Sequence, residues 1–418
     1  MGWNSWDAYG SAITEKEVRA NADAMARDLK PYGWQYIVVD IQWYEPNAKA
    51  GGYRPGAALD MDNHARLIPA ANRFPSAANG AGFKPLADYV HSLGLKFGIH
   101  ILRGIPRQAV GQNVMIAGTK HTPAEIADTS SICQWNTDMY GVDMSKPGAQ
   151  AYYDSLAALY ASWGVDFIKA DDMSRPYHSA EIAALHKAIV RSGRPMVLSL
   201  SPGPAPAAQV ASLRENANMW RVSDDVWDEW RLIRKSFDYA ETWAPLIQPG
   251  HWPDQDMLPL GHIGIRAHVG DDRMTRLTKD EQRSLMTLWA INRSPLIFGG
   301  DLPTLDPWTK AMLTNQMLLD LDQHSTANRL VEKQGDIRVW TAGEPGTGAT
   351  YVALFNLGEQ AQQASIDLSQ LSVKRSTNGH PHEAKDVWPE DRAMDSALKG
   401  SSISTTLSSH GVRLLLVR

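Results

Sequence analysis

The stretch Phe167–Ser174 reads FIKADDMS, in which an apolar run leads into a lysine and two adjacent aspartates. The segment before it, SWGVD (162–166), contains the glycine that commonly ends a helix shortly before a strand. We therefore predict a buried strand that presents Lys169, Asp171 and Asp172 at its carboxyl end. Most charged strand ends are merely solvated, so this one alone does not indicate a function.

Short apolar runs of the same kind recur through the first three quarters of the chain. Amphipathic helical patterns lie between them, for example at 15–30, 149–163 and 279–291. Eight strands that alternate with helices over about 320 residues favour a parallel (β/α)8 barrel, the TIM barrel. An open doubly wound sheet is the alternative, which the lack of a G-x-G-x-x-G motif after the first strand weakens. The expected strands are at 2–6, 35–43, 96–102, 167–172, 196–201, 219–225, 251–257 and 295–301.

The pattern changes after about Asn328. Short apolar runs such as IRVWTAG (337–343), TYVALFNLG (350–358) and VRLLLVR (412–418) are separated there by Gly, Pro, Asn and Ser clusters. This pattern is typical of antiparallel β structure in a small sandwich. We therefore predict two domains, a (β/α)8 barrel over 1–327 and a C-terminal antiparallel β-sandwich over 328–418.

The composition of the 418 residues, with 43% hydrophobic and 21% charged side chains, is that of an ordinary globular protein. The net charge is -5 and there is no basic run, so nucleic acid and anionic membrane are not expected partners. No apolar run approaches the roughly 20 residues that span a bilayer. The chain has 15 tryptophans against 7 phenylalanines, and large flat side chains with a polar group suit sugar faces.

The single cysteine, Cys133, excludes an intrachain disulfide framework and fits either the cytoplasm or a bacterial envelope compartment. The opening MGWNSWDAYG (1–10) has neither the basic nor the apolar region of a signal peptide. Because a strand-like motif begins at Met1 itself, we expect a segment upstream of this numbering. The expected location is periplasmic or secreted, with the cytoplasm as the alternative, and the sequence indicates no oligomeric state.

Charged side chains recur at the predicted strand ends, where barrel enzymes place their chemistry. Carboxylates across a barrel mouth with aromatic side chains beneath them are typical of a glycosidase, in which one attacks the anomeric carbon and the other protonates the leaving oxygen. Nearby lysine and arginine would keep the nucleophile ionised. The first three strands supply Trp3 and Trp6, then Asp40, then His100 and Arg103. The fourth supplies Lys169, Asp171 and Asp172, the sixth Arg221, Asp224 and Asp225, and the seventh Asp254 and Asp256.

Taken singly, each of these residues has a plainer interpretation. Asp171 and Asp225 could each equally well be a solvated charge at a strand end. Lys169 could be an ion-pair partner without a catalytic task, and Trp3 a core residue. His100 lacks the H-x-x-H or H-E-x-x-H spacing of a metal site, so we expect neither a metal nor another cofactor. The glycosidase interpretation depends on the recurrence of the set at successive strand ends.

Six motifs also match a known family in order and spacing. MGWNSW (1–6), YIVVDIQW (36–43), GVDFIKADD (164–172), WRVSDD (220–225), HWPDQDML (251–258) and LWAINRSPLIFGGDL (288–302) resemble strands of glycoside hydrolase family 27, the α-galactosidase and α-N-acetylgalactosaminidase family. The match covers nearly the whole chain, including the tail that ends HGVRLLLVR (410–418). The resemblance implies a retaining mechanism with two carboxyl groups about 5–5.5 Å apart. It makes Asp171 the nucleophile and Asp225 the acid/base, and lines the sugar subsite with Trp3, Asp40, Lys169, Arg221 and Asp256.

Several positions depart from the family pattern. Ile41 stands where typical α-galactosidases have a second aspartate, His100 where a tyrosine is common, and Met173 where one cysteine of a pair would be. Ser201 replaces a glutamate that contacts the 2-hydroxyl, which is similar to the N-acetylgalactosaminidase members. Ile41 removes a hydrogen-bond acceptor and adds bulk, which favours a sugar without a hydroxymethyl group, such as β-L-arabinopyranose, or a differently decorated galactoside.

The function predicted from these residues is a retaining exo-glycosidase, α-galactosidase-like, that hydrolyses terminal α-D-galactosyl residues of oligosaccharides or glycoconjugates by double displacement. The alternatives are the same mechanism on α-N-acetylgalactosaminides or β-L-arabinopyranosides, a catalytically inactive carbohydrate-binding barrel, and a phosphate-binding barrel enzyme. The presence of both Asp171 and Asp225 argues against the inactive barrel, since a binding protein can lose either. The expected partner is a carbohydrate.

Overall fold

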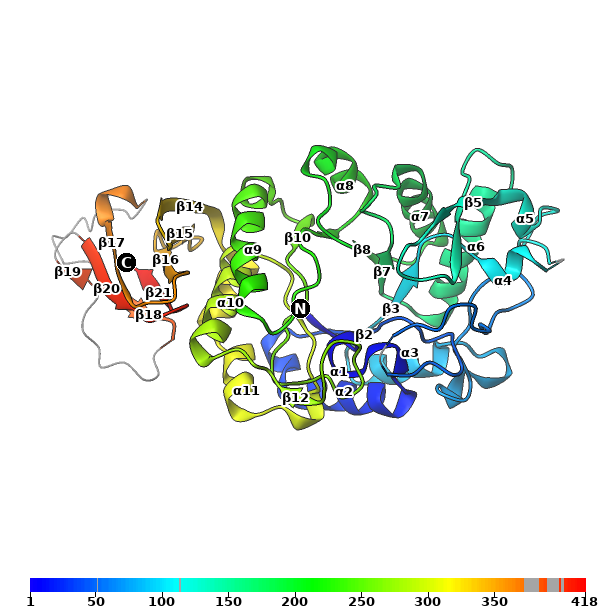
Figure 1. Cartoon of the computed structure of the whole chain (residues 1–418), viewed down its shortest axis with the longest axis horizontal. Coiled ribbons are helices and arrows are strands. Elements are labelled where there is room, and N and C mark those ends of the chain that lie inside the picture. The colour runs from blue at the N-terminus through cyan, green and yellow to red at the C-terminus, as the bar shows by residue number, and fades with distance from the viewer. Residues whose placement is uncertain (51, 113, 372–382, 389–397, 400–401) are drawn as a thin grey trace. The chain divides into compact units, whose positions relative to one another are not determined.

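The computed structural model describes the chain except for residues 51, 113, 372–382, 389–397 and 400–401 (Figure 1). The chain divides into two compact units, which are described separately below. The first comprises Met1–Asp225, Met257–Thr275 and Ile297–Leu305, and the second comprises Val226–Asp256, Arg276–Leu296 and Asp306–Arg418.

The predicted barrel sheet is present and has eight strands, each within one of the eight predicted runs. Seven strands belong to the first unit, where they follow the order β9-β8-β7-β3-β2-β1-β13 and each neighbouring pair runs parallel. They are β1 (Gly2–Asn4), β2 (Tyr36–Val39), β3 (Lys96–Leu102), β7 (Phe167–Asp171), β8 (Val197–Leu200), β9 (Met219–Arg221) and β13 (Ile297–Phe298). The eighth, β10 (Trp252–Asp254), consists of residues of the second unit.

The strand register brings the charged strand ends together. His100 of β3 pairs with Lys169 of β7, and Lys169 pairs in turn with Ser199 of β8. Apolar side chains such as Ile99 and Ile168 are fully buried in the same strands. Parallel strands present their carboxyl ends on one face, so this register places the residues that follow β2, β3, β7 and β8 at one mouth.

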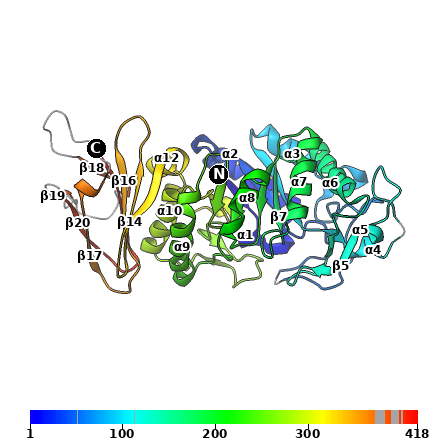
Figure 2. The same cartoon turned by 90° about the horizontal axis from the view of Figure 1, so that it is seen from above.

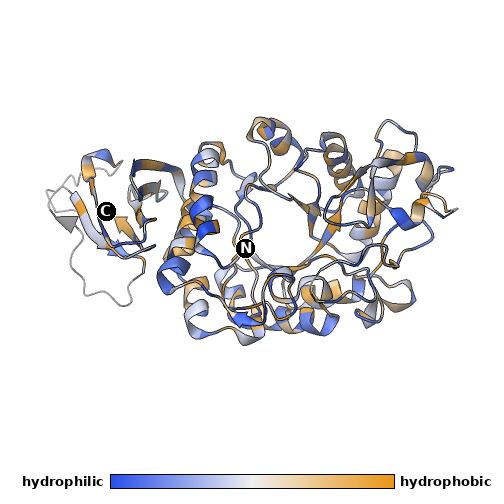
Figure 3. Cartoon of the chain, in the orientation of Figure 1, coloured by the Kyte–Doolittle hydropathy of each residue, from blue (hydrophilic) through white to orange (hydrophobic). Residues whose placement is uncertain are grey.

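Helices of the first unit connect successive strands. α2 (Glu15–Asp28) begins with a capping box between Thr14 and Glu17, and α6 (Ala149–Trp163) ends at Gly164, whose φ of 82° is left-handed. α6 packs against α7 (Ser179–Ser192) (Figure 2). Hydrophilic and hydrophobic residues alternate along the helices in Figure 3, as expected for helices with one buried face. The other helices of this unit are α1 (Trp6–Tyr9), α3 (Lys84–Ser92), α4 (Arg107–Val110), α5 (Pro123–Ile126) and α8 (Val210–Asn216).

The connection between β3 and β7 contains a small antiparallel sheet that sequence patterns did not predict. Its strands are β4 (Ile105–Pro106), β5 (Ala127–Ile132) and β6 (Met139–Val142), in the order β4-β6-β5. β5 is half-buried or exposed throughout and reads ADTSSI, so it lacks the apolar alternation on which strand prediction depends. A short hairpin of β11 (His262–Ile263) and β12 (Arg273–Met274) also lies in this unit.

Among its described residues, the second unit contains four α-helices and the C-terminal β structure. The helices are α9 (Trp230–Trp243), α10 (Lys279–Ile291), α11 (Pro307–Leu313) and α12 (Gln316–His324). One antiparallel sheet has the order β14 (Thr326–Gln334), β15 (Ile337–Gly343), β16 (Thr350–Asn356), β21 (Val412–Val417), β18 (Ala384–Asp386). The other has the order β17 (Gln362–Asp367), β20 (Ser402–Leu407), β19 (Leu398–Lys399).

Side chains of both C-terminal sheets share one apolar cluster, which includes Val339 and Leu354 from the larger sheet and Ile366 and Ile403 from the smaller. Two antiparallel sheets over one apolar core form a β-sandwich, so the predicted C-terminal fold is confirmed. Within the described part of the chain, no helix is both long enough and apolar enough to cross a membrane.

Candidate active site

A pocket of about 450 Å³ lies in the first unit. Its wall includes residues that directly follow β2 and β8 and residues at the carboxyl ends of β7 and β9, together with residues from the long loops. The predicted site residues that line it are Asp40, Ile41, Lys169, Asp171, Ser201, Arg221 and Asp225. The structure therefore brings together most of the residues that the strand-end pattern selected.

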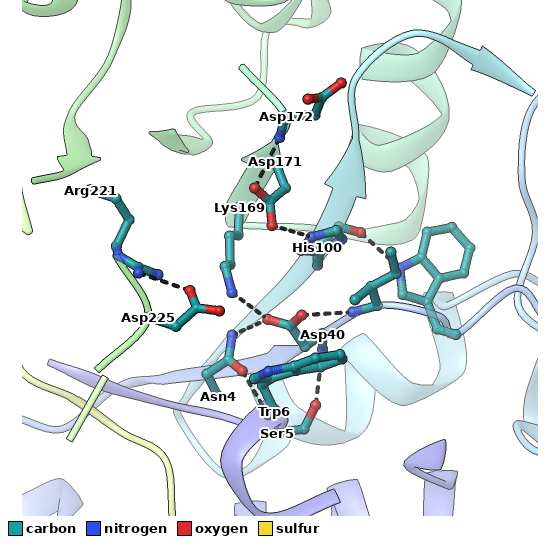
Figure 4. A network of polar contacts seen from close by, with 12 residues as sticks. Asn4, Ser5, Trp6, Asp40, His100, Lys169, Asp171, Asp172, Arg221 and Asp225 are labelled. Carbon is teal, nitrogen blue, oxygen red and sulfur yellow. Dashed lines mark hydrogen bonds and ion pairs between the residues drawn. The ribbon is translucent and has the colours of Figure 1, made fainter. Parts of the chain in front are cut away.

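Asp40 is the centre of a buried group of contacts (Figure 4). Its Oδ2 accepts hydrogen bonds from Nζ of Lys169 at 2.8 Å and from Nδ2 of Asn4 at 2.7 Å. The backbone amide of Asp40 donates to Oγ of Ser5 at 3.0 Å. Burial alone would raise the pKa of Asp40, but the charges of Lys169 and His100 outweigh it and lower this pKa. Asp40 is thus a fixed anion that holds the lysine side chain in the pocket.

Asp171 is held from two sides. Nε2 of His100 lies 3.2 Å from its Oδ2, and its Oδ1 accepts the backbone amide of Asp172 at 2.9 Å. Burial would raise the pKa of Asp171, but the hydrogen bond and charge of His100, followed by the charge of Lys169, lower it well below the usual range. The carboxylate is therefore ionised throughout the ordinary pH range, as a nucleophile requires.

The second carboxylate, Asp225, is in a different environment. Its side chain is 60% exposed, against 15% for Asp171, and its Oδ1 accepts a hydrogen bond from the buried Arg221 at 3.0 Å. One carboxylate of the pocket is thus enclosed and held by a histidine, while the other faces solvent. This difference suits two separate chemical roles.

Ile41 and Ser201 contribute the uncharged part of the wall. Both are almost fully buried, and both line the pocket. The backbone amide of Ile41 donates to Oδ1 of Asp40 at 2.9 Å, which fixes the isoleucine next to the Asp40–Lys169 pair. Oγ of Ser201 has no hydrogen-bond partner among the described residues.

Three predicted site residues do not line the pocket. Trp3 is fully buried and its indole donates to the carbonyl of Gly300 at 2.7 Å. His100 is also fully buried, so its contact is with Asp171 behind the pocket surface. Asp256 belongs to the second unit, where its Oδ2 accepts the amide of Val226 at 2.7 Å and its carbonyl accepts the indole of Trp289.

Comparison with known proteins places this site in a family. The family model for α-galactosidase A matches residues 140–324, and the model for the α-galactosidase C-terminal β-sandwich domain matches residues 334–417. The crystal structure of a family 27 β-L-arabinopyranosidase from Geobacillus stearothermophilus is 54% identical, with a TM-score of 0.95 over 100% of this chain and 95% of that one. The chain belongs to glycoside hydrolase family 27.

Curated relatives agree with this assignment. The α-galactosidase of Cyamopsis tetragonoloba is 28% identical over 100% of this chain and 85% of its own. The α-N-acetylgalactosaminidase of Gallus gallus is 25% identical over 99% of this chain and 91% of its own. The protein is a glycoside hydrolase with the (β/α)8 barrel and C-terminal β-sandwich of the family.

The pocket of this family 27 enzyme also contains residues that sequence reasoning did not select for the site. They are Tyr53, Trp135, Arg175, Pro202, Met257 and His268, with Trp6 and Asp224 noted only as strand-end residues. Tyr53 and Trp135 come from the long connections after β2 and β3, which have no periodicity that would direct them to the mouth. The high tryptophan content was the one signal for such aromatic residues, and it did not indicate positions.

A buried ion-pair network supports the loop that follows Asp171 in this family 27 enzyme. Arg103 contacts Asp172 at 2.8 Å and Glu181 at 2.7 Å, and all three side chains are at most 7% exposed. The hydroxyl of Tyr153 donates to Glu181 at 2.6 Å. Asp172 has a φ of 59°, in the left-handed region that costs energy for a residue other than glycine. The network therefore fixes a backbone conformation directly after Asp171, where the family resemblance led us to look for a cysteine pair.

Among the residues that the structure describes, no group of three or more His, Cys, Asp or Glu side chains is arranged to hold a metal ion. The charged groups of the pocket are instead paired with one another, as in Lys169 with Asp40.

Proposed function

We propose that this glycoside hydrolase is a retaining exo-enzyme for terminal sugars with the ring configuration of α-D-galactopyranose. The observation that carries the proposal is the unequal environment of two carboxylates in one pocket. Asp171 is enclosed and strongly ionised, whereas the side chain of Asp225 is 60% exposed to solvent in the same pocket. Double displacement needs this combination of a permanent anion and a proton-exchanging acid.

In the first step, a carboxylate oxygen of Asp171 attacks the anomeric carbon and the bond to the leaving oxygen breaks. The protonated Asp225 gives its proton to that oxygen, so the leaving group departs as an alcohol. In the second step, Asp225 takes a proton from water, which attacks the glycosyl ester and releases Asp171. Two inversions give net retention. Lys169 and Arg221 are placed to contact sugar hydroxyls, since both line the pocket beside the carboxylates.

The identity of the glycone depends on Ile41. β-L-Arabinopyranose has the same ring configuration as α-D-galactopyranose but lacks the hydroxymethyl group. The apolar, buried side chain of Ile41 next to Asp40 offers no acceptor to a hydroxyl and occupies space in the wall. The 54% identical Geobacillus protein is named a β-L-arabinopyranosidase, which supports a preference for β-L-arabinopyranose. The enzyme thus accepts both sugars and prefers the β-L-arabinopyranoside.

A second glycone, the α-N-acetylgalactosaminide, is favoured by Ser201. By the family resemblance Ser201 lies beside the 2-substituent of the sugar, and its small, uncharged side chain lines the pocket and leaves room there. This candidate requires no change in the roles of Asp171 and Asp225.

A panel of nitrophenyl glycosides tests these proposals. kcat/KM is measured for the β-L-arabinopyranoside, α-D-galactoside, α-N-acetylgalactosaminide and α-D-glucoside, and the anomer first released is identified by NMR. The expected result is hydrolysis with retention, fastest on the β-L-arabinopyranoside, then on the α-D-galactoside, with none on the α-D-glucoside. Inversion would overturn the mechanism, and preference for the α-N-acetylgalactosaminide would replace the glycone assignment by the second candidate.

A further inference from the structure

The mouth of the pocket carries an exposed tryptophan. Trp135 is 39% exposed and lines the same pocket as Asp171 and Asp225. Single exposed apolar side chains are common on protein surfaces and by themselves indicate nothing. The position of Trp135 differs from such cases because it borders a pocket whose inner part holds the reacting groups.

Trp135 is the outer member of a series of aromatic rings. Its ring centroid lies 5.6 Å from that of Tyr53, and Tyr53 stacks on Trp6 at 6.0 Å with an interplanar angle of 21°. Exposure increases along the series, from 7% at Trp6 through the half-buried Tyr53 to Trp135. Burial, with the charges of Asp40, Asp171 and Asp225, raises the pKa of Tyr53 well above its usual value. The series thus extends from beside the carboxylates to the solvent edge of the pocket.

The loop that presents Trp135 is anchored on both sides. Cys133 before it and Asn136 after it are both buried, and burial raises the pKa of the Cys133 thiol to about 12. Oδ1 of Asn136 accepts the amide of Asp138 at 2.7 Å, and the Asp138 carboxylate accepts hydrogen bonds from Gln42 at 2.6 Å and Tyr44 at 2.9 Å. The backbone on both sides of Trp135 is therefore held in place, which reduces the entropy lost when a ligand stacks on the indole.

The pocket is larger than one sugar ring requires. A pentopyranose has about ten non-hydrogen atoms, and even at the about 30 Å³ that each molecule takes in liquid water they would fill only about 300 Å³. The pocket volume of about 450 Å³ exceeds this. In an exo-glycosidase the remaining space lies on the leaving-group side of the acid/base residue. Two charged side chains of the pocket wall, Arg175 and Asp224, form an exposed ion pair at 2.7 Å and offer hydrogen-bonding groups to hydroxyls.

We propose that Trp135 is the platform of an aglycone subsite, on which the sugar ring on the leaving-group side of the scissile bond stacks. The occupant is a pyranose of an oligosaccharide, whose face of C–H groups packs on the indole while its hydroxyls reach the Arg175–Asp224 pair. This inference rests on the proposed function, because it defines the leaving group relative to Asp225. It implies that the natural substrate is a saccharide in which the terminal sugar is linked to another sugar.

The role of Trp135 as a platform is tested with two kinds of substrate that share one glycone and differ in the leaving group. A glycosyl fluoride has a leaving group without a ring, whereas a disaccharide or nitrophenyl glycoside has a ring that can stack. Trp135→Ala is expected to lower kcat/KM about 2- to 12-fold on the ring-bearing substrates, mostly through KM. The same variant is expected to change kcat/KM on the fluoride less than 2-fold. Trp135→Phe should restore most of the loss, since it keeps an aromatic face.

Tyr32→Ala is the matched control, because Tyr32 is also 39% exposed and does not line the pocket. It should leave both substrates unaffected, and melting temperatures of all variants show whether they fold. Equal losses of Trp135→Ala on fluoride and disaccharide, or no loss on either, would overturn the platform. A wild-type enzyme that hydrolyses neither the fluoride nor any panel glycoside would overturn the proposed function instead, so the two failures are distinct.

Discussion

Nε2 of His100 lies 3.2 Å from Oδ2 of Asp171, which places a fully buried imidazole behind the enclosed carboxylate of the active-site pocket. The other ring nitrogen, Nδ1, is buried and has no hydrogen-bond partner among the described residues. Nε2 is therefore the nitrogen through which this histidine acts on its surroundings. The contact helps to keep Asp171 ionised and fixes the direction of its carboxylate oxygens.

Replacing His100 should change the pH dependence of the enzyme. In His100→Phe, the pKa of Asp171 rises because burial is no longer offset by the hydrogen bond and charge of the histidine. Since the nucleophile must be ionised, the acid limb of the kcat/KM profile moves to higher pH. A hydrogen bond to a charged group contributes about 1.5–3 kcal/mol, so kcat/KM should also fall about 10-fold or more at its optimum. His100→Gln keeps a donor and should recover part of the loss. An unmoved acid limb in His100→Phe would contradict this role.

Asp171→Asn should reduce turnover by about 10⁴-fold or more, because a carboxamide cannot form the glycosyl ester. Asp172→Asn is the matched control, since this neighbouring carboxylate contacts Arg103 rather than the pocket. It should lower the melting temperature while much of the activity remains. With Asp171→Ala, added azide should give a glycosyl azide of inverted configuration, detected by NMR. Equal activity of the Asp171 and Asp172 variants would rule out the nucleophile assignment.

Asp225→Ala should affect substrates according to their leaving groups. A disaccharide needs a proton on the leaving oxygen, whereas fluoride or a dinitrophenolate leaves with little assistance. The loss in kcat/KM should therefore be about 100-fold or more on a disaccharide and much smaller on an activated glycoside. Asp88→Ala removes a comparably exposed carboxylate, 57% against 60%, that pairs with Lys84 and does not line the pocket, and it should show no such dependence. The acid/base role would be refuted by equal losses on both classes of substrate.

Arg103→Met should destabilise the protein, because it leaves Asp172 and Glu181 buried without their cation. Breaking a buried ion pair from one side costs about 3–5 kcal/mol, and these side chains are at most 7% exposed. Arg191→Met is the control, since its ion pair with Asp154 is largely exposed and such pairs contribute about 0–1 kcal/mol. Thermal unfolding followed by circular dichroism should show a large decrease for the first variant and little change for the second. Similar melting temperatures for the two would mean that the network does not stabilise the loop that follows Asp171.

The barrel was predictable because each strand is a short apolar run that ends in polar residues, as in FIKADD, and because helices with clear periodicity separate the runs. The same regularity located Asp40, Lys169, Asp171, Arg221 and Asp225, since in a barrel a strand end is a position in space as well as in sequence. The β-sandwich followed from the short apolar runs of β15 and β16, whose side chains contribute to its core.

Other parts of the site depend on contacts that no local pattern records. Trp135 reaches the pocket through an irregular loop that is anchored by Cys133 and Asn136, and neither residue has periodic neighbours. The contact of His100 with Asp171 depends on the register of β3 against β7, which pairs His100 with Lys169. Trp3 and Trp6 lie three residues apart, yet only Trp6 lines the pocket, because it stands in α1 after the strand has ended.

Ile41→Asp tests whether Ile41 determines the specificity of the pocket for its sugar. In the proposed pose, a hydroxyl of galactose that faces Ile41 lacks an acceptor, which costs about 1–3 kcal/mol. An aspartate there should raise the ratio of kcat/KM on α-D-galactoside to that on β-L-arabinopyranoside by about 10- to 100-fold. Ile41→Val keeps the wall apolar and should leave the ratio unchanged. Because Ile41 is only 1% exposed, an aspartate that the pocket does not solvate destabilises the fold, so the melting temperature is measured together with the specificity. A large loss of stability with an unchanged ratio would show that Ile41 acts as a packing residue, and would leave the roles of Asp171 and Asp225 unaffected.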